Sequence, residues 1–234
     1  MSSSSVATIE SFQTDFITFS LSVGVLKFGT FTLKSGRVSP YFFNAGLFAS
    51  GRALSKLGRA YASSIMASDA LANGDGTVNF DVIFGPAYKG ISLGAVVASS
   101  LYDMFGVDVG FAYNRKEAKD HGEGGMLVGA SMEGKRVLVV DDVISAGTAI
   151  RESHEMLVGI KAVPVGVSIA LDRAEKRSLD DPVSAVQAVA RDLEIPVVSI
   201  VGLKQLFGYL QNSTDFDTDV LKAVVDYRSE YGVE

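Results

Sequence analysis

The chain has 234 residues, of which 47% are hydrophobic and 21% charged, and its formal net charge is −6 at pH 7. This composition is typical of a folded globular protein, and the negative charge excludes a general nucleic-acid binder, which needs a surplus of Lys and Arg. The absence of cysteine excludes disulfides and thiolate chemistry, and two histidines are too few for a multi-histidine metal site.

The sequence also predicts the cellular location of the protein. The N-terminal stretch MSSSSVATIE has neither a basic segment nor an apolar core, so we do not expect a signal peptide. The longest apolar run, at 162–171, is about half as long as a bilayer-spanning helix. We therefore expect a soluble, cytoplasmic protein that binds neither membrane nor nucleic acid.

The elements predicted before residue 80 are two helices around an extended stretch. Apolar residues recur at helical spacing over 9–19 and again over 54–65. Between these helices, the segment 34–36 marks a turn, and 38–43 is expected to be extended. A loop rich in Gly, Asn and Asp follows at 72–79.

From residue 80 onward, short apolar strands alternate with helices. Strands are expected at 80–84, 108–113, 136–140, 163–171 and 196–200, and helices at 91–105, 149–158 and 183–193. This alternation predicts an α/β protein with a mainly parallel sheet flanked by helices on both faces. Because such sheets bind ligands beyond the carboxyl ends of their strands, the segments after Phe84, Tyr113, Val140 and Leu171 are the informative ones.

Two adjacent aspartates, Asp141 and Asp142, follow the strand at 136–140. Either water solvates both acids and Ser145 or Thr148 caps the next helix, or a ligand requires two carboxylates that repel each other. The residues from Ser145 to Thr148 add hydroxyls, small side chains and free N–H groups at a helix N-terminus, which together suit an anion. An acid pair beside such a turn suits a sugar phosphate.

The segment 115–125 combines three glycines with many charged side chains. It is either an ordinary solvated loop or a mobile lid whose cations close over an anionic leaving group. Its candidate cations are Arg115, Lys116, Lys119 and His121.

Four segments carry a resemblance to a known family. VLVVDDVISAGTA, at 137–149, resembles the phosphoribosyl diphosphate (PRPP) motif of the type I phosphoribosyltransferases. FGPAYKGISLGA at 84–95, FAYNRKEAKDHGEGG at 111–125 and LKSGRVSPYFFNAG at 33–46 are together similar to orotate phosphoribosyltransferases. The resemblance runs from about Val25 to Arg173, with a weaker likeness to fungal-type single-function enzymes through the C-terminus.

The resemblance implies a fold and a domain organisation. The fold is the type I phosphoribosyltransferase fold, a mainly parallel sheet flanked by helices with a smaller hood built largely from the N-terminal region. A single domain is implied over 1–234, with its core roughly at 51–200 and a mobile lid at 115–125. The hood is placed mainly at 1–50, with part of the C-terminal region.

The implied reaction joins orotate to PRPP, giving orotidine 5′-monophosphate and diphosphate in de novo pyrimidine biosynthesis. The family works with Mg²⁺, which is expected near Asp141 and Asp142 through PRPP and water, with no direct protein ligand assigned. A homodimer that shares its active sites between subunits is also implied. Small-molecule substrates, orotate and PRPP, are thus the expected partners.

The resemblance assigns site residues by position. The implied catalytic residues are Lys119, Asp141 and Asp142. The implied orotate contacts are Phe42, Phe43, Arg173 and Ser145, a position that is often Thr in the family. The implied PRPP contacts are Lys27, Tyr88, Lys89, Arg115, Lys116, Lys119, His121, Asp141, Asp142, Val143, Ile144, Ser145, Ala146, Gly147, Thr148 and Ala149.

Two other functions remain open at this point. Another type I phosphoribosyltransferase, using a purine or uracil, shares the 141–148 turn but is not expected to carry KSGRVSPYFFN or RKEAKDHGEGG. A regulatory protein that binds PRPP without turnover would keep the phosphate turn and lose the lid, whereas Lys119 and His121 are both present here.

Overall fold

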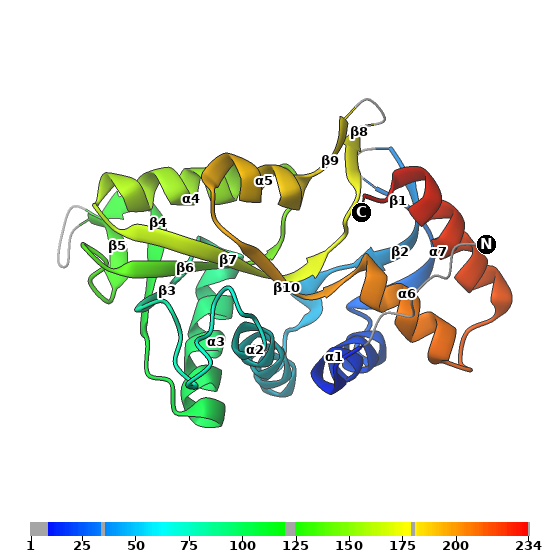
Figure 1. Ribbon diagram of the computed structural model, residues 1–234, viewed down its shortest axis with the longest axis horizontal. Helices are drawn as coiled ribbons and strands as arrows, with labels where there is room; N and C mark the ends of the chain where they lie inside the picture. The colour runs from blue at the N-terminus through cyan, green and yellow to red at the C-terminus, as the bar shows by residue number, and fades with distance from the viewer. Residues whose placement is uncertain (1–8, 34–35, 120–124, 179–180, 234) are drawn as a thin grey trace.

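The computed structural model describes residues 9–33, 36–119, 125–178 and 181–233, with only the backbone at 118, 119 and 178 (Figure 1). The helices are α1 (Ser11–Ser22), the short 3-10 helix η1 (Ala45–Leu47), α2 (Gly51–Met66), α3 (Lys89–Phe105), α4 (Thr148–Gly159), α5 (Ala185–Leu193), α6 (Leu203–Asn212) and α7 (Thr218–Tyr231). The strands are β1 (Leu26–Thr32), β2 (Val38–Phe43), β3 (Val82–Gly85), β4 (Gly110–Lys119), β5 (Gly125–Gly129), β6 (Arg136–Val143), β7 (Val163–Asp172), β8 (Lys176–Ser178), β9 (Asp181–Ser184) and β10 (Val197–Gly202). Within the described ranges, no helix is long and apolar enough to span a membrane.

The central sheet has the strand order β10-β7-β6-β3-β4-β5. The first five strands are mutually parallel, and β5 pairs antiparallel with β4. The expectation of a mainly parallel sheet is therefore confirmed. All four residues of β3 are buried, as a strand covered on both faces requires.

Side chains of β6 alternate between two core clusters. Val137 and Val139 pack with residues of α4 and α5, whereas Leu138 and Val140 pack with residues of α1, α2 and α3. Figure 1 shows α4 and α5 on one side of the sheet and α2 and α3 on the other. Because successive residues of a strand face opposite ways, a continuous apolar run has both faces buried here.

A second group of elements lies at one end of the molecule. The antiparallel β1–β2 pair, α1, α6 and α7 gather there, beside the end of β7 (Figure 1). Aromatic contacts join them, because Phe28 of β1 packs edge-on against Phe216, and Tyr41 of β2 packs edge-on against Tyr227 of α7. N-terminal and C-terminal segments of the chain thus pack together into one unit.

The structure corrects the prediction of a loop over 115–125. The backbone at 115–119 belongs to β4, which extends past β3 and pairs with β5, so that Lys119 lies opposite Gly125. The hairpin forms by backbone pairing, which needs no apolar pattern, and the polar sequence therefore concealed it. The strands β1, β5, β8 and β9 were not predicted either, and Val183 lies in β9 instead of the helix that follows.

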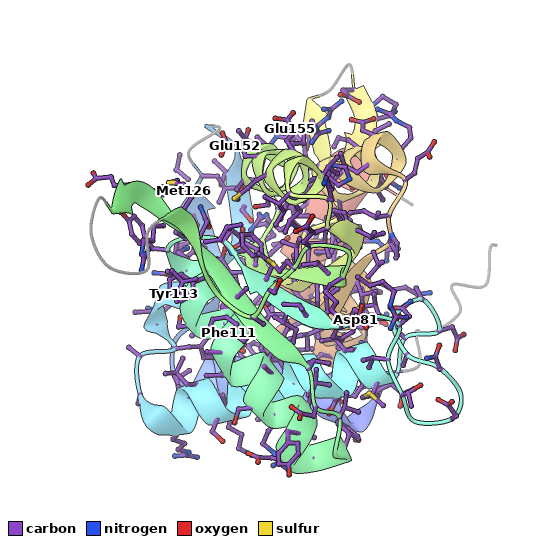
Figure 2. The ribbon with its side chains drawn as sticks, turned by 90° about the vertical axis from the view of Figure 1, so that its left-hand side faces the viewer. Asp81, Phe111, Tyr113, Met126, Glu152 and Glu155 are labelled. Atoms are coloured by element: carbon purple, nitrogen blue, oxygen red, sulfur yellow. The ribbon has the colours of Figure 1, made fainter. Side chains whose placement is uncertain are left out.

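The carboxyl ends of β7, β6, β3 and β4 lie side by side at one edge of the sheet. Figure 2 shows Met126 of β5 toward this edge and Asp81 at the opposite end, with Phe111 and Tyr113 along β4. At the opposite end, Asp81 accepts hydrogen bonds from the backbone and the guanidinium of Arg136. The four segments singled out by the sequence therefore share one edge.

Candidate active site

The turn after β6 buries one carboxylate and ties it to a neighbouring element. Asp142 is 7% exposed, and its Oδ2 accepts a 2.6 Å ion-paired hydrogen bond from Nζ of Lys89, at the start of α3. Its Oδ1 accepts from the backbone N–H of Val143 at 3.0 Å. The interpretation in which water solvates both acids is thus wrong for Asp142.

Asp141 has a strongly perturbed carboxyl group. Burial raises the pKa of Asp141 to about 6; the N–H of Asp142 bonds to its Oδ1 at 2.8 Å and lowers the pKa, and the Asp142 charge raises it. The carbonyl of Asp141 also accepts a 2.7 Å hydrogen bond from the buried Tyr61 hydroxyl of α2. Perturbed acids at a strand's carboxyl end are typical of functional sites.

We expect activity to fall as the Asp141 carboxyl is protonated. An acid with a pKa of about 6 is ionised above pH 6, so below that pH it can no longer accept hydrogen bonds as a carboxylate. For the reaction with PRPP that the sequence resemblance implies, the second-order rate constant should then fall about tenfold for each pH unit below 6. Because the diphosphate of PRPP titrates as well, the measurement compares the wild-type pH profile with that of Asp141→Asn, which should lack this step. Identical profiles would contradict the prediction.

The segment after Asp142 presents backbone and small side chains to the edge of the sheet. Ile144 is 8% exposed and packs in the core, while Ser145, Ala146, Thr148 and Ala149 are exposed. Val143 is half-buried. The side chains of Val143 and Ile144 are therefore used for packing. The turn 145–149, exposed except at Gly147, provides the N–H groups and hydroxyls that suit a phosphate.

Gly147 caps α4, so the alternative in which Ser145 or Thr148 caps this helix is wrong. Its φ is +80°, in the left-handed region, and a Cβ there would lie 2.6 Å from Cγ2 of Val189 and 2.7 Å from Nη1 of Arg151. Only glycine meets both requirements. The tight turn leaves the N-terminus of α4 uncovered by its own cap.

The segment 86–89, at the junction of β3 and α3, is hydrogen-bonded to β6 and to β4. Lys89 reaches Asp142 as described, and the backbone N–H of Ala87 donates to Oδ1 of Asn114 in β4 at 2.8 Å. Tyr88 is 70% exposed, and Nζ of Lys116 lies 5.1 Å from the centre of its ring. The peptide bond between Ala87 and Tyr88 is cis.

Part of the predicted lid is described by the structure. Arg115 donates from Nη1 to the carbonyl of Gly125 at 3.2 Å, which links the two strands of the hairpin. Lys119 is placed through its backbone alone. His121 lies outside the described residues, as does the rest of 120–124.

The predicted orotate contacts on β2 face different surroundings. Phe43 is half-buried and packs with Phe16 and Phe48, so one of the two rings belongs to the core, as expected. Phe42 is 39% exposed and stacks on Phe31 with ring centres 5.5 Å apart. Lys27 of β1 pairs with Phe42 across the strands. An exposed aromatic face beside a lysine suits a flat, anionic ring.

Arg173 lies directly after β7 and reaches across to β2. Its Nη2 forms a 2.7 Å ion pair with Oε1 of Glu175 and donates to Oγ of Ser39 at 3.1 Å. Its guanidinium lies 4.4 Å from the centre of the Tyr41 ring. The side chain is 22% exposed and thus is not the free surface arginine that its position alone indicates.

Direct contacts link some of the predicted site residues. Lys89 joins the acid pair and Lys116 joins Tyr88, whereas Arg173 lies with β2. Across the described residues, no hydrogen bond or ion pair connects Ser145 with Arg173. Sequence reasoning missed Tyr61, Asn114 and Glu175, because their roles arise from contacts across distant parts of the chain.

Comparisons with known proteins identify the family of the chain. Residues 53–200 match the family model described as a phosphoribosyl transferase domain. The chain is 52% identical to the orotate phosphoribosyltransferase of Stutzerimonas stutzeri and 51% identical to that of Vibrio cholerae, over 96% of this chain and 100% of each relative. It also resembles the crystal structure of orotate phosphoribosyltransferase from Francisella tularensis, with a TM-score of 0.82, 42% identity, and coverage of 93% of this chain and 99% of that one.

Proposed function

The chain belongs to the orotate phosphoribosyltransferase family, and on that premise we propose that it transfers the phosphoribosyl group of PRPP to orotate. The products are orotidine 5′-monophosphate and diphosphate, in pyrimidine biosynthesis. The predicted family and the type I phosphoribosyltransferase fold are thereby confirmed. The observation that carries the proposal is the acid pair at 141–142, beside an uncovered helix N-terminus at the carboxyl edge of the sheet.

The bond changes in the transfer are simple. The ring nitrogen N1 of orotate attacks C1 of the ribose, and the C–N bond forms. The bond from C1 to the diphosphate oxygen breaks with its electron pair leaving on the diphosphate, and the N1–H bond breaks with its proton passing to the departing diphosphate. Asp141 and Asp142 accept hydrogen bonds from the ribose hydroxyls and add negative potential beside the positive charge that develops on the sugar. The turn from Ser145 to Ala149 holds the 5′-phosphate.

The cations of the site act on the diphosphate. Tyr88 and Lys89 approach from the β3–α3 segment, and Arg115 and Lys116 from the β4–β5 hairpin. A departing diphosphate carries growing negative charge, and preorganised cations stabilise that charge without reorganising. Since Lys89 is paired with Asp142 in the structure, we propose that it exchanges this partner for the diphosphate when PRPP binds.

The residues at this edge fit a magnesium ion held largely by substrate. Asp141 and Asp142 offer the hard oxygens that Mg²⁺ prefers, but one oxygen of Asp142 is bonded to Lys89. Among the described residues, no group of three or more His, Cys, Asp or Glu is arranged to hold a metal ion. We propose that the two aspartates hold Mg²⁺ through PRPP hydroxyls and water. When bound, the ion supplies positive charge to the leaving diphosphate.

The proposal is tested by mixing the protein with orotate, PRPP and Mg²⁺ and following the loss of orotate absorbance together with diphosphate release. Parallel reactions with uracil, adenine, guanine and hypoxanthine should show no comparable turnover. Preferred use of one of those bases would instead favour another type I phosphoribosyltransferase. Binding of PRPP without any diphosphate release would favour the regulatory protein.

We also propose that the protein is a cytoplasmic homodimer with active sites shared between subunits, and light scattering tests the dimer. A core roughly at 51–200, with a hood formed by 1–50 and part of the C-terminal region, is proposed as well. In its support, β2 packs against α7, and β1 packs against Phe216 between α6 and α7, at one end of the molecule.

Replacing Arg173 with alanine should weaken orotate binding selectively. The guanidinium is placed to grip the orotate carboxylate or a ring carbonyl through paired hydrogen bonds, and PRPP does not need this contact. We expect the KM for orotate to rise at least about tenfold, corresponding to one charge-assisted hydrogen bond, while the KM for PRPP changes less than about twofold. Initial rates with each substrate varied in turn measure both constants. A larger rise for PRPP than for orotate would remove Arg173 from the orotate site.

A further inference from the structure

We propose that Glu175 is a positioning residue of the orotate site, which acts by holding the guanidinium of Arg173 in the orientation that receives the substrate carboxylate. The inference rests on the proposed function and on the Arg173 assignment. It assigns to the orotate site a second charged residue, which the LDRAEK segment places two positions after Arg173.

Glu175 is the centre of a nearly buried cluster of polar groups. Its side chain is 10% exposed. Oε1 forms the 2.7 Å ion pair with Nη2 of Arg173 and accepts a 2.9 Å hydrogen bond from the Tyr41 hydroxyl. Its other oxygen lies 4.0 Å from Nη1 of Arg37. A carboxylate with so little exposure persists in a fold only where cations and donors compensate its lost hydration, and here three groups do so.

The same contacts restrict Arg173 on three sides. Glu175 holds one nitrogen, Ser39 accepts from that nitrogen at 3.1 Å, and the Tyr41 ring lies 4.4 Å from the guanidinium carbon. An arginine side chain has several rotatable bonds, and fixing them on substrate binding costs conformational entropy. A guanidinium that is already oriented avoids much of that cost, so Glu175 should strengthen orotate binding without touching orotate.

The backbone that carries Glu175 is fastened independently of its side chain. Glu175 forms an isolated β-bridge with Gly232, and the N–H of Val233 donates to the carbonyl of Ala174 at 2.8 Å. Arg37 donates from Nη1 to the carbonyl of Lys176 at 2.7 Å. A change confined to the Glu175 carboxylate therefore leaves these anchors in place, and this makes a mutational test interpretable.

The cluster includes one further acid that faces the same region. Burial raises the pKa of Asp172, and the Glu175 charge raises it as well, while the N–H of Ala174 bonds to its Oδ1 at 2.8 Å. Asp172 thus supports the backbone turn after β7, whereas the carboxylate that contacts the guanidinium is that of Glu175. The orienting role is assigned to Glu175 on this geometry.

Two substitutions at Glu175 separate orientation from charge. Glu175→Ala removes both the acceptor and the charge, and we expect the KM for orotate to rise about tenfold with the KM for PRPP unchanged within about twofold. Glu175→Gln keeps an acceptor of nearly the same shape, so we expect a rise of only about threefold. If Glu175 instead competed with the substrate carboxylate for Arg173, both variants would lower the KM for orotate, and the proposal would be overturned.

A double-mutant cycle shows whether Glu175 acts through Arg173. In an Arg173→Ala background, Glu175→Ala should change the KM for orotate less than about twofold further, because the group that it orients is gone. A full additional tenfold rise would overturn the proposal. So would an equal rise in both KM values for the single variants, which would indicate a merely structural role.

Asp181→Asn is the matched control, because Asp181 also pairs with an arginine, Arg177, in the adjacent β8–β9 hairpin. It should leave both KM values unchanged, and thermal unfolding of each variant checks folding.

The three possible negative results can be told apart. Wild-type protein that does not consume orotate refutes the proposed function, and an Arg173→Ala variant with normal KM values refutes the Arg173 assignment. A normal KM for orotate in both Glu175 variants, when Arg173→Ala raises it, refutes this inference alone.

Discussion

Replacing Lys119 with alanine should lower the turnover number about a hundredfold while PRPP still binds. The resemblance of FAYNRKEAKDHGEGG to the family's lid places this lysine over the leaving diphosphate, and the backbone of Lys119 lies at the tip of the described part of β4. Losing one contact to charge that develops in the transition state costs on the order of 3 kcal/mol. Because that charge is largely absent in the ground state, the KM for PRPP should change much less than the turnover number.

Rapid-mix measurement of diphosphate release, with PRPP affinity determined separately, tests this expectation. The matched control is Lys161→Ala, since the Lys161 side chain is 82% exposed and pairs only with Glu133 on the surface among the described residues. Near-normal turnover of Lys119→Ala with PRPP bound would exclude the catalytic role.

The same variant also tests whether active sites are shared. At an orotate concentration well below the raised KM of Arg173→Ala, a mixture of Lys119→Ala with Arg173→Ala should regain activity if each lid serves the neighbouring subunit. A mixed dimer then has one site without either change. No recovery after subunit exchange would argue against shared sites.

Replacing Gly85 with alanine should lower the free energy of unfolding by about 3 kcal/mol, at the upper end of the range for overpacking. A Cβ at Gly85 would lie 1.9 Å from the carbonyl oxygen of Gly90 and 2.5 Å from its carbonyl carbon. Both atoms belong to the backbone of α3, which cannot rotate away as a side chain can. The structure thus explains Gly85 and Gly90 by the close contact of β3 with α3.

Thermal unfolding measures this loss, which for a chain of this length corresponds to a midpoint lower by about 6–12 °C. Activity should fall as well, since Lys89 lies next to Gly90 and is held against Asp142. Gly159→Ala is the control, because nothing lies within 4 Å of a Cβ there and alanine favours the helix. A Gly85→Ala variant as stable as this control would contradict the close approach.

The central sheet could be predicted from local sequence because its signals are local. Runs such as RVLVV, whose four apolar residues are buried on both faces, distinguish a parallel strand from a half-exposed one without knowledge of its partners. The acid pair and the small turn after it are likewise contiguous, so their resemblance to the PRPP motif indicated a type I phosphoribosyltransferase, and three further contiguous segments indicated the orotate family. Gly147 is also a local signal, because a glycine in this turn is what the left-handed backbone conformation requires.

Tertiary structure alone decided which groups meet. Lys89 and Asp142 are 53 residues apart, and Tyr41 and Glu175 are 134 apart, so no local pattern relates them. Their contacts depend on the order of strands in the sheet and on how the N-terminal and C-terminal segments pack beside the end of β7. The extension of β4 past β3 also escaped prediction, because hairpin pairing satisfies backbone groups whatever the side chains are.

The sequence by itself therefore determined the sheet, the phosphate turn and the family, through periodicity and contiguous motifs. Long-range packing determined which acid is buried, which cation neutralises it and which carboxylate orients Arg173, because burial and ion pairing are properties of neighbours in space.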